Sequence, residues 1–269
     1  MKRFVAMCLI TFVACESGSH EINNRHMRSG LKVSRIINGE PADIRQYPWQ
    51  ASLRVIRSHV CGAVIVSPWT AITAAHCVLD FDSRKGLYTI QVGSSRLSKG
   101  GYVITVDDAI VHPKYKPSTH GYDLALLKFK RNIVKESRHL AKPVKILEDE
   151  SNLHPVQACK ITGWGRILKD NHVVPTDQLQ VAQTALLDKD TCSRNFWGKT
   201  LGFDNICVYT RSNGACMGDS GGPLICNGRL VGITSWGHRS CSVKYPNVYT
   251  RVSPYRDWIM SKLWKLPLH

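Results

Sequence analysis

The sequence predicts an all-β protein, a sandwich or a barrel, with one short helix near its end. Between residues 36 and 253, short apolar or alternating runs are separated by turn residues, without helical periodicity. Residues 88–92, 102–106 and 230–236 are examples of such runs. The chain has 269 residues, 43% of them apolar, which suffices for one large β domain or two small cores packed together.

The N-terminal segment has the features of a secretory signal peptide in their usual order. Lys2 and Arg3 precede an apolar stretch at residues 4–14, and small residues follow it. The signal is expected to end near residue 17, and a lipid-modified Cys15 is a weaker alternative. A membrane span would need about 18 or more apolar residues, and none is expected. The product is therefore expected to be secreted and extracellular.

Two local patterns locate elements in the last part of the chain. The dipeptide Asn227-Gly228 lies between two short apolar runs and is typical of a two-residue β-hairpin turn. Ser253 is suited to cap a helix, and Pro254 suits its first position. Apolar residues then recur on one helical face, at Tyr255, Trp258, Ile259 and Leu263. A C-terminal helix is therefore expected over about residues 254–265.

The charge is strongly basic, with 36 Lys and Arg against 20 Asp and Glu and a net charge of +16. Part of the excess lies in one run: Lys128, Lys130, Arg131, Lys135, Arg138, Lys142 and Lys145. Such a field attracts heparin-like polyanions, acidic substrates or anionic surfaces. A merely solvated basic face is an equal alternative. Sequence-specific nucleic-acid binding is not expected, because zinc-finger spacing, aromatic interleaving and a basic helix are missing from the sequence.

Export changes how the ten cysteines are interpreted. Cys8 and Cys15 lie in or beside the signal, and an even set of eight remains. In an oxidising compartment such a set predicts disulfides, although the sequence alone allows about 105 pairings. The alternative is a zinc site from neighbouring residues: His59, Cys61, His76 and Cys77. Export disfavours it, so no metal and no cofactor are expected.

The most informative segment is Gly-Asp-Ser-Gly-Gly-Pro at residues 218–223. A serine hydroxyl needs a base to attack at neutral pH, and flanking glycines let backbone amides approach a developing oxyanion. The segment also fits the G-x-S-x-G turn of α/β-hydrolases, but that fold places its acid and histidine after the serine. Only His238 and His269 follow Ser220, so this alternative fails.

Two segments upstream supply the missing partners. Thr-Ala-Ala-His-Cys at residues 73–77 contains His76, and Asp-Leu-Ala-Leu-Leu at residues 123–127 begins with Asp123. With Ser220, these segments resemble the three triad segments of chymotrypsin-like serine proteases. Gly-Trp-Gly at residues 163–165 and Ser-Trp-Gly at residues 235–237 resemble further signatures of that family. The resemblance covers roughly residues 36–265.

The resemblance implies a serine endopeptidase that works by acyl transfer. Ser220 would attack the scissile carbonyl, His76 would accept its proton, and Asp123 would orient His76. The backbone N–H groups of Gly218 and Ser220 would form the oxyanion hole.

The resemblance also implies the architecture. The peptidase domain, residues 36–269, would hold two antiparallel six-stranded β-barrels with the active site between them and a C-terminal helix. The barrels would occupy about residues 36–145 and 146–253. The implied disulfides are Cys61–Cys77, Cys159–Cys226, Cys192–Cys207 and Cys216–Cys241.

The sequence around Arg35 resembles the family's activation junction, since Ile-Ile-Asn-Gly follows it. Residues 18–35 would then be a propeptide that is lost on cleavage. The freed Ile36 amine would pair with the acid beside the nucleophile, Asp219, because a buried charge needs a partner. This pairing would couple cleavage to formation of the active site.

The residue at the base of the family's specificity pocket is here Gly214, followed by Ala215. Without an acid, a Lys or Arg side chain would be buried unpaired, so a trypsin-like preference is disfavoured. Gly237 leaves the mouth open, and Asn247 replaces a usually small residue. The remaining implied pocket residues are Ser235 and Trp236.

A hydrophobic preference for Phe, Tyr, Leu or Met is expected, and an elastase-like preference for smaller residues is the alternative. Arg35 would then be cleaved by another, trypsin-like protease. The expected partners are protein or peptide substrates, that activating protease, protein inhibitors and heparin-like polyanions. Two other functions stay open: a catalytically weak, polyanion-binding homologue and an esterase that spares peptide bonds.

Overall fold

A computed structural model describes residues 36–263, except residues 38, 152, 171 and 199–200. The expected signal peptide (residues 1–17), the expected propeptide (residues 18–35) and residues 264–269 therefore lie outside the described residues. Nearly all regular structure in the described part is antiparallel β, as the sequence predicts. No described helix is long and apolar enough to cross a membrane.

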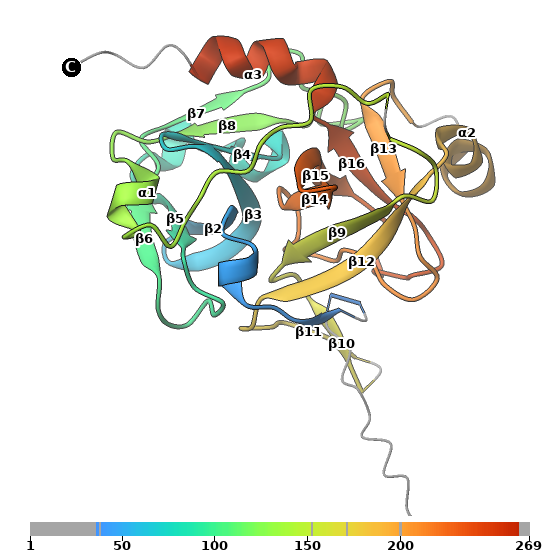
Figure 1. Cartoon of the computed structure of the whole chain (residues 1–269), viewed down its shortest axis with the longest axis horizontal. Helices are drawn as coiled ribbons and strands as arrows, with labels where there is room; N and C mark the ends of the chain where they lie inside the picture. Colours follow the sequence, from blue (N-terminus) through green and yellow to red (C-terminus); the bar gives the residue numbers. More distant parts are fainter. Residues whose placement is uncertain (1–35, 38, 152, 171, 199–200, 264–269) are drawn as a thin grey trace, which may run out of the picture. The chain divides into compact units, whose positions relative to one another are not determined.

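The first sheet is formed by the earlier half of the chain, in the order β6-β5-β2-β3-β4-β8-β7 (Figure 1). Its strands are β2 (Gln50–Val55), β3 (Ser58–Ser67), β4 (Thr70–Thr73), β5 (Tyr88–Val92), β6 (Tyr102–Thr105), β7 (Asp108–Val111) and β8 (Ala125–Lys128). Within the described residues, its edge strands β6 and β7 are not hydrogen-bonded to each other. The sheet is therefore a half-barrel.

One bent stretch of chain donates hydrogen bonds to strands near both edges of this half-barrel. Val106 still donates its N–H to Tyr88 of β5, whereas Asp107 donates to Lys128 of β8. The bend between them transfers the chain from one edge strand to the other. The expected six-stranded barrel is thus not closed in this half: among the described residues its seven-stranded sheet stays open between β6 and β7, which only the bend in the chain connects.

The second sheet closes into a six-stranded barrel, because β12 pairs with both β13 and β9. Its strands are β9 (Ala158–Gly163), β12 (Gln180–Leu187), β13 (Asn205–Val208), β14 (Pro223–Cys226), β15 (Arg229–Trp236) and β16 (Asn247–Arg251). β1 (Glu40–Pro41) joins it on the outside by pairing with β12. The start of the described chain therefore belongs to the second sheet, although a boundary between the halves near residue 145 remains a prediction.

Alternation and turn chemistry explain these strands. In β12 the residues Gln180, Ala182, Thr184 and Leu186 are buried in steps of two, which places one face on the core. Asn227 and Gly228 join β14 to β15 with φ angles of 50° and 71°, as a hairpin turn with two left-handed residues requires. The predicted hairpin is confirmed.

Short elements connect the strands. They are β10 (Ile167–Lys169) paired with β11 (His172–Val174), α1 (Ile133–Glu136), α2 (Lys189–Cys192), a π-helical turn (Ser193–Trp197) and 3-10 turns at Ile44–Gln46, Ala75–Val78, Asp82–Arg84 and Ser253–Tyr255. The C-terminal helix α3 spans Arg256–Leu263 and follows the last 3-10 turn directly. Ser253 does not cap it; its hydroxyl donates to the Glu150 carboxylate instead.

The C-terminal helix packs on the first half of the chain although it follows the second. Ile259 is fully buried in the same core cluster as Leu53 and Leu126. Trp258 meets His112 edge to face, with ring centroids 4.8 Å apart. The helix therefore fastens the end of the chain across β7 and β8 (Figure 1).

Four disulfides stabilise the described chain. Their pairings are the four that the resemblance implies: Cys61–Cys77, Cys159–Cys226, Cys192–Cys207 and Cys216–Cys241. The first joins β3 to the turn that carries His76, and the last joins two loops that line the pocket described below. Closing a loop of about 15 residues stabilises a fold by roughly 3 kcal/mol in the chain-entropy account.

Candidate active site

The two halves of the chain meet at the segments that carry His76, Asp123 and Ser220. His76 lies in the 3-10 turn after β4, Asp123 lies just before β8, and Ser220 lies in the loop before β14. Gly62 of β3 donates its N–H to the carbonyl oxygen of Ser220 over 2.7 Å. Gly221, with φ of 78°, approaches β4 so closely that a Cβ there would lie 2.2 Å from Thr73 Oγ1. Glycine is therefore required at this contact.

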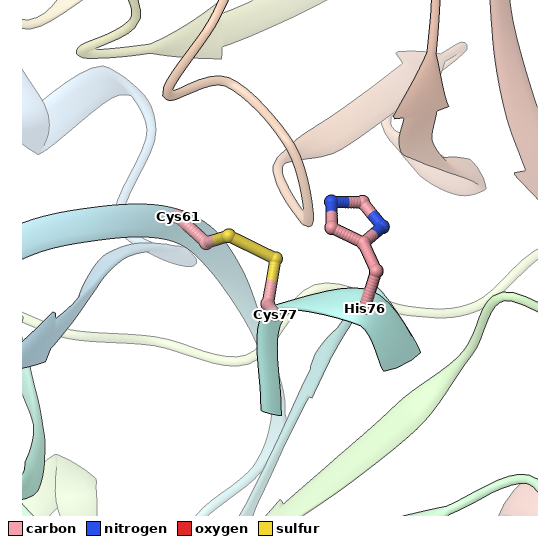
Figure 2. A group of neighbouring side chains, drawn as sticks. All are labelled: Cys61, His76 and Cys77. Carbon is pink, nitrogen blue, oxygen red and sulfur yellow. A yellow bond between two sulfur atoms is a disulfide. The ribbon is translucent and has the colours of Figure 1, made fainter. Parts of the chain in front are cut away.

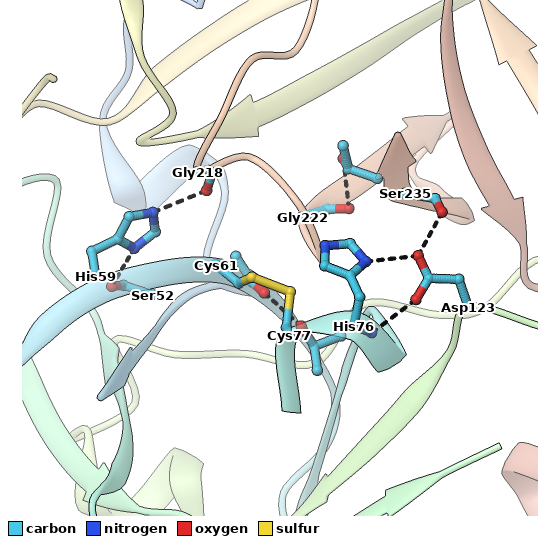
Figure 3. Close-up of a disulfide and its surroundings, with 12 residues drawn as sticks. Ser52, His59, Cys61, His76, Cys77, Asp123, Gly218, Gly222 and Ser235 are labelled. Atoms are coloured by element: carbon cyan, nitrogen blue, oxygen red, sulfur yellow. Dashed lines mark hydrogen bonds and ion pairs between the residues drawn. A yellow bond between two sulfur atoms is a disulfide. The ribbon is translucent and has the colours of Figure 1, made fainter. Parts of the chain in front are cut away.

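His76 and Asp123 form a directly bonded pair (Figure 3). His76 Nδ1 lies 2.8 Å from Asp123 Oδ2, and the backbone N–H of His76 donates to Oδ1 over 3.0 Å. Ser235 Oγ donates to the same Oδ2 over 2.5 Å. Burial by itself would raise the pKa of Asp123, but the hydrogen bonds from His76 and Ser235 outweigh it and hold that pKa below its usual value. Asp123 is therefore an ionised acceptor that fixes the His76 ring.

Ser220 is half-buried at the edge of a cavity. Within the described part of the chain, its hydroxyl makes no hydrogen bond with His76. Such bonds are often long or poorly aligned before substrate binds, so the bonded line from acid to nucleophile is complete here only from Asp123 to His76.

The backbone of the loop at residues 218–222 leaves two donors free. The N–H groups of Asp219, Gly221 and Gly222 donate to backbone carbonyls within the fold. Among the described residues, those of Gly218 and Ser220 have no acceptor. These are the two groups that the resemblance assigns to the oxyanion hole.

Asp219 lies fully within the protein, against the Gly-Trp-Gly segment. Its carboxylate accepts the N–H groups of Gly165 and Cys216, over 2.8 and 2.9 Å. A Cβ on Gly163 or Gly165 would lie 2.1 or 2.3 Å from that carboxylate, so both glycines make room for it. Burial raises the pKa of Asp219 to about 6 despite these two hydrogen bonds. No basic side chain of the described residues pairs with it.

The segment after Arg35 is already docked in the second half. Ile36 is completely buried in the core of the second barrel, with Ile161 and Leu224. Ile37 bridges to Gly214, at the predicted base of the pocket. Arg35 itself lies outside the described residues.

The sequence profile of the family described as Trypsin matches residues 36–259. The chain belongs to the trypsin family of serine proteases. Similar proteins include Hypodermin-B of Hypoderma lineatum, which is 35% identical over 84% of this chain and 86% of its own length. Trypsin of Phaedon cochleariae is 34% identical over 83% of this chain and 86% of its own.

Two further comparisons extend the likeness. Trypsin Blo t 3 of Blomia tropicalis is 32% identical over 97% of this chain and 98% of its own, so that alignment also reaches into residues 1–35. Among solved structures, neuropsin, a serine protease expressed in the limbic system of mouse brain, superposes with a TM-score of 0.73. It is 29% identical, and the match covers 84% of this chain and 98% of that one.

A cavity of about 350 Å³ lies beside Ser220. Of the predicted pocket residues, Ala215, Ser235, Trp236, Gly237 and Asn247 line it. Gly214 does not line it, but a Cβ on Gly214 would lie 2.6 Å from Asn247 Oδ1. The described lining residues include Arg239 and His238 but no carboxylate.

The side chain of Asn247, the first residue of β16, reaches across the pocket to the backbone of Ala215. Its Oδ1 accepts the N–H of Ala215 over 2.8 Å, and its Nδ2 donates to the Ala215 carbonyl oxygen over 3.2 Å. A Cβ on Gly237 would lie 2.5 Å from the same Nδ2. The amide is thus fixed in place, and it fills the space that Gly214 and Gly237 leave open.

The zinc site considered from the sequence does not fit the chemistry of the residues. Cys61, His76 and Cys77 do lie close together (Figure 2). The two sulfurs, however, form a disulfide, so neither is a thiolate that could bind zinc. His59 points elsewhere, to Ser52 and Gly218 (Figure 3).

His59, which the sequence suggests only as a zinc ligand, has a supporting role that the sequence pattern does not indicate. Its Nε2 lies 2.9 Å from the carbonyl oxygen of Gly218, and its Nδ1 lies 2.9 Å from Ser52 Oγ. A carbonyl oxygen only accepts, so Nε2 carries the proton and Nδ1 accepts from Ser52. Burial lowers the pKa of His59 to about 4, although the bond to Gly218 opposes this. A neutral His59 therefore holds the Gly218 peptide in place.

Ser235 was predicted only as a pocket residue, and its bond to Asp123 was missed. The carbonyl oxygen of Asp123 is also bound, by Thr250 Oγ1 over 3.0 Å. Neither contact has a signal in the sequence, because both partners come from strands of the other half, more than a hundred residues away. Only folding brings them to Asp123.

Proposed function

We propose that this trypsin-family protease is secreted as a precursor, is activated by cleavage after Arg35, and hydrolyses peptide bonds beside neutral residues. The observation that carries the proposal is the His76–Asp123 pair, held next to a loop with two free backbone donors. Four disulfides fit an oxidising compartment, which supports secretion.

In the proposed mechanism, Ser220 Oγ attacks the scissile carbonyl while His76 takes its proton. Asp123 keeps the His76 ring in the required tautomer and stabilises the imidazolium that forms. The N–H groups of Gly218 and Ser220 donate to the oxyanion of the tetrahedral intermediate. His76 then returns the proton to the leaving amine. In the second stage, water takes the place of Ser220 as the nucleophile, attacks the acyl-enzyme with His76 as base, and releases the product acid.

Activation would provide Asp219 with a partner. The carboxylate is fully buried and, among the described residues, bound only by backbone N–H groups. Leaving such a charge unpaired is costly, whereas an amine at Ile36 would offset the cost. Asp219 is bonded to Cys216 and lies beside Gly218 in sequence, so the pair would also steady the oxyanion loop.

The proposed specificity rests on the pocket. A Lys or Arg side chain would meet the Asn247 amide instead of a carboxylate, and Arg239 nearby adds repulsion. Neutral side chains avoid this penalty. Because the amide shortens the space above Gly214, we expect Leu and Met to be preferred over Phe and Tyr.

The test uses the full-length precursor after treatment with a trypsin-like protease. N-terminal sequencing of the active chain is expected to begin at Ile36, and a peptide library is expected to be cut after neutral residues. A serine-directed acylating inhibitor should label the activated chain but not its Ser220→Ala variant. That variant should lose on the order of 10⁶-fold in kcat, by analogy with related triads.

Labelling of Ser220→Ala at another residue would refute the triad, and cleavage mainly after Lys or Arg would refute the pocket argument. Hydrolysis of esters without any peptide cleavage would favour the esterase alternative.

A further inference from the structure

A second imidazole lies beside the proposed triad. His120 sits in the turn between Lys116 and Gly121, which bridge each other, and its φ of 50° is in the left-handed region. This conformation brings the His120 ring next to His76. The ring centroids are 5.9 Å apart, with the planes at 87°.

One nitrogen of His120 lies inside the protein without a partner. Nδ1 is inaccessible to solvent and makes no hydrogen bond with any described residue. It lies 4.0 Å from Asp123 Oδ2, beyond hydrogen-bonding distance. The His120 side chain is nevertheless 41% exposed and that of His76 24%, so the cluster is accessible from solvent. An unpaired buried nitrogen has a cost that a ligand would remove.

His76, His120 and Asp123 together have the donor set of a transition-metal site. One ligand atom of each lies within 4.8 Å of the other two. Zinc binds imidazole nitrogen and carboxylate oxygen at about 2.0–2.2 Å, which places its ligand atoms roughly 3.3 Å apart. Binding would therefore require side-chain rotations that draw the three atoms together.

We propose that His120, with His76 and Asp123, forms a regulatory site for Zn²⁺ or a similar borderline cation. Two imidazoles disfavour hard cations such as Ca²⁺ and Mg²⁺, which bind through oxygen. The three ligands leave a fourth position for water.

Occupation of this site would stop catalysis, an effect that rests on the proposed function. A cation on His76 Nε2 occupies the lone pair that takes the Ser220 proton. A cation on His76 Nδ1 displaces the bond to Asp123 that orients the ring. In both cases His76 no longer acts as a base, so the cation is a reversible inhibitor.

The activity test compares the activated wild type with His120→Asn. Asparagine tolerates the left-handed backbone and removes the imidazole, so the fold and basal activity should persist. Zn²⁺ should inhibit the wild type, with recovery on adding EDTA. His120→Asn should require at least about tenfold more Zn²⁺ for half inhibition, since even outer partners of zinc ligands contribute 10–100-fold in affinity.

His172→Asn, in the exposed start of β11, is the matched control and should be inhibited like the wild type. Mg²⁺ at the same concentrations should have no effect. Equal zinc sensitivity of His120→Asn and the wild type would overturn the site, as would a wild type that Zn²⁺ does not inhibit.

Calorimetric titration of Zn²⁺ into the Ser220→Ala protein separates the site from the proteolytic function. The Ser220→Ala protein should bind Zn²⁺, and adding His120→Asn should lower that affinity at least about tenfold. This result would support the site even if no peptide is ever cleaved. Absence of binding in a chain whose wild type does cleave peptides refutes the site and leaves the proposed function intact.

Discussion

At the scale of single residues, Asn247 shows how a side chain can decide a property that the whole site shares. Its amide is fixed by two hydrogen bonds to Ala215 and occupies the space between Gly214 and Gly237. Both glycines are therefore part of one feature, because larger residues at either position would collide with the amide. The Asn247 amide therefore shortens the pocket at this end and makes that end polar but uncharged.

Two substitutions at Asn247 test this role. Asn247→Asp keeps the shape and adds a carboxylate, so cleavage after Lys or Arg should rise relative to Leu by about tenfold or more. Asn247→Gly removes the amide and should shift the preference toward Phe and Tyr by roughly 10–200-fold, the range for a filled or emptied methylene-sized space. Ratios of kcat/KM for matched peptides measure both, and unchanged ratios in both variants would show that Asn247 does not limit the pocket.

At the scale of elements, Asp204 connects the loop that carries Asp123 to the second barrel. Its carboxylate is 2% exposed and accepts the N–H of Tyr122 over 2.8 Å and the hydroxyl of Tyr255 over 2.7 Å. Burial raises the pKa of Tyr255, and the bond to Asp204 raises it further, so this hydroxyl stays a donor at neutral pH. Three segments far apart in sequence thus meet at one carboxylate next to Asp123.

Asp204→Ala should leave both donors buried and unpaired. At about 1–3 kcal/mol for each, the free energy of unfolding should fall by roughly 2–6 kcal/mol, and kcat should fall because Tyr122 no longer holds its neighbour Asp123. Asp204→Asn, which can still accept, should cost less. Urea unfolding of the precursor measures the first effect, with the exposed Asp82→Ala as a control expected to change stability by no more than about 0.5 kcal/mol. Equal stability of Asp204→Ala and that control would contradict the connecting role.

At the scale of the whole molecule, the proposed activation would link the state of the N-terminus to the stability of the fold through Asp219. In the uncleaved chain its pKa is about 6, against an ordinary value of 3.8, because burial disfavours its charge. The folded precursor therefore holds this proton more tightly than the unfolded chain does. The resulting stabilisation is complete below about pH 4 and is lost as the pH rises toward 6.

Comparison of the precursor with its Asp219→Asn variant isolates this contribution. From pH 4 to pH 7, the stability of Asp219→Asn should rise relative to the wild type by roughly 2 kcal/mol, since each pKa unit is worth about 1.4 kcal/mol and the unfolded carboxyl is already about half ionised at pH 4. In the cleaved chain the Ile36 amine should favour the carboxylate and reverse the trend. Denaturant unfolding at the two pH values checks both forms. Parallel pH profiles of wild type and variant in the precursor would show that Asp219 is not the group responsible.

Much of the fold could be predicted because its signals are local. The Asn227-Gly228 turn, the apolar run at residues 230–236 and the C-terminal helix each depend on a few neighbouring residues. The unpredicted features depend on contacts across the chain. Ser253 was expected to cap the helix, yet its hydroxyl donates to Glu150, which is distant in sequence. Two six-stranded barrels were expected, yet the first sheet has seven strands and stays open between β6 and β7 in the described chain, where only a bend after Val106 connects the two edges.

Through its fixed motifs the sequence determined the resemblance to the family, and this resemblance implied the all-β architecture, the four disulfide pairings and the three residues proposed as the triad. Only the tertiary structure decided how those residues are supported: Ser235 on Asp123, His59 on Gly218, and Asn247 across the pocket. It also decided that His120 lies against His76. The physical reason is that hydrogen bonds and metal ligands act over about 2–4 Å, and only folding sets such distances between residues far apart in the chain.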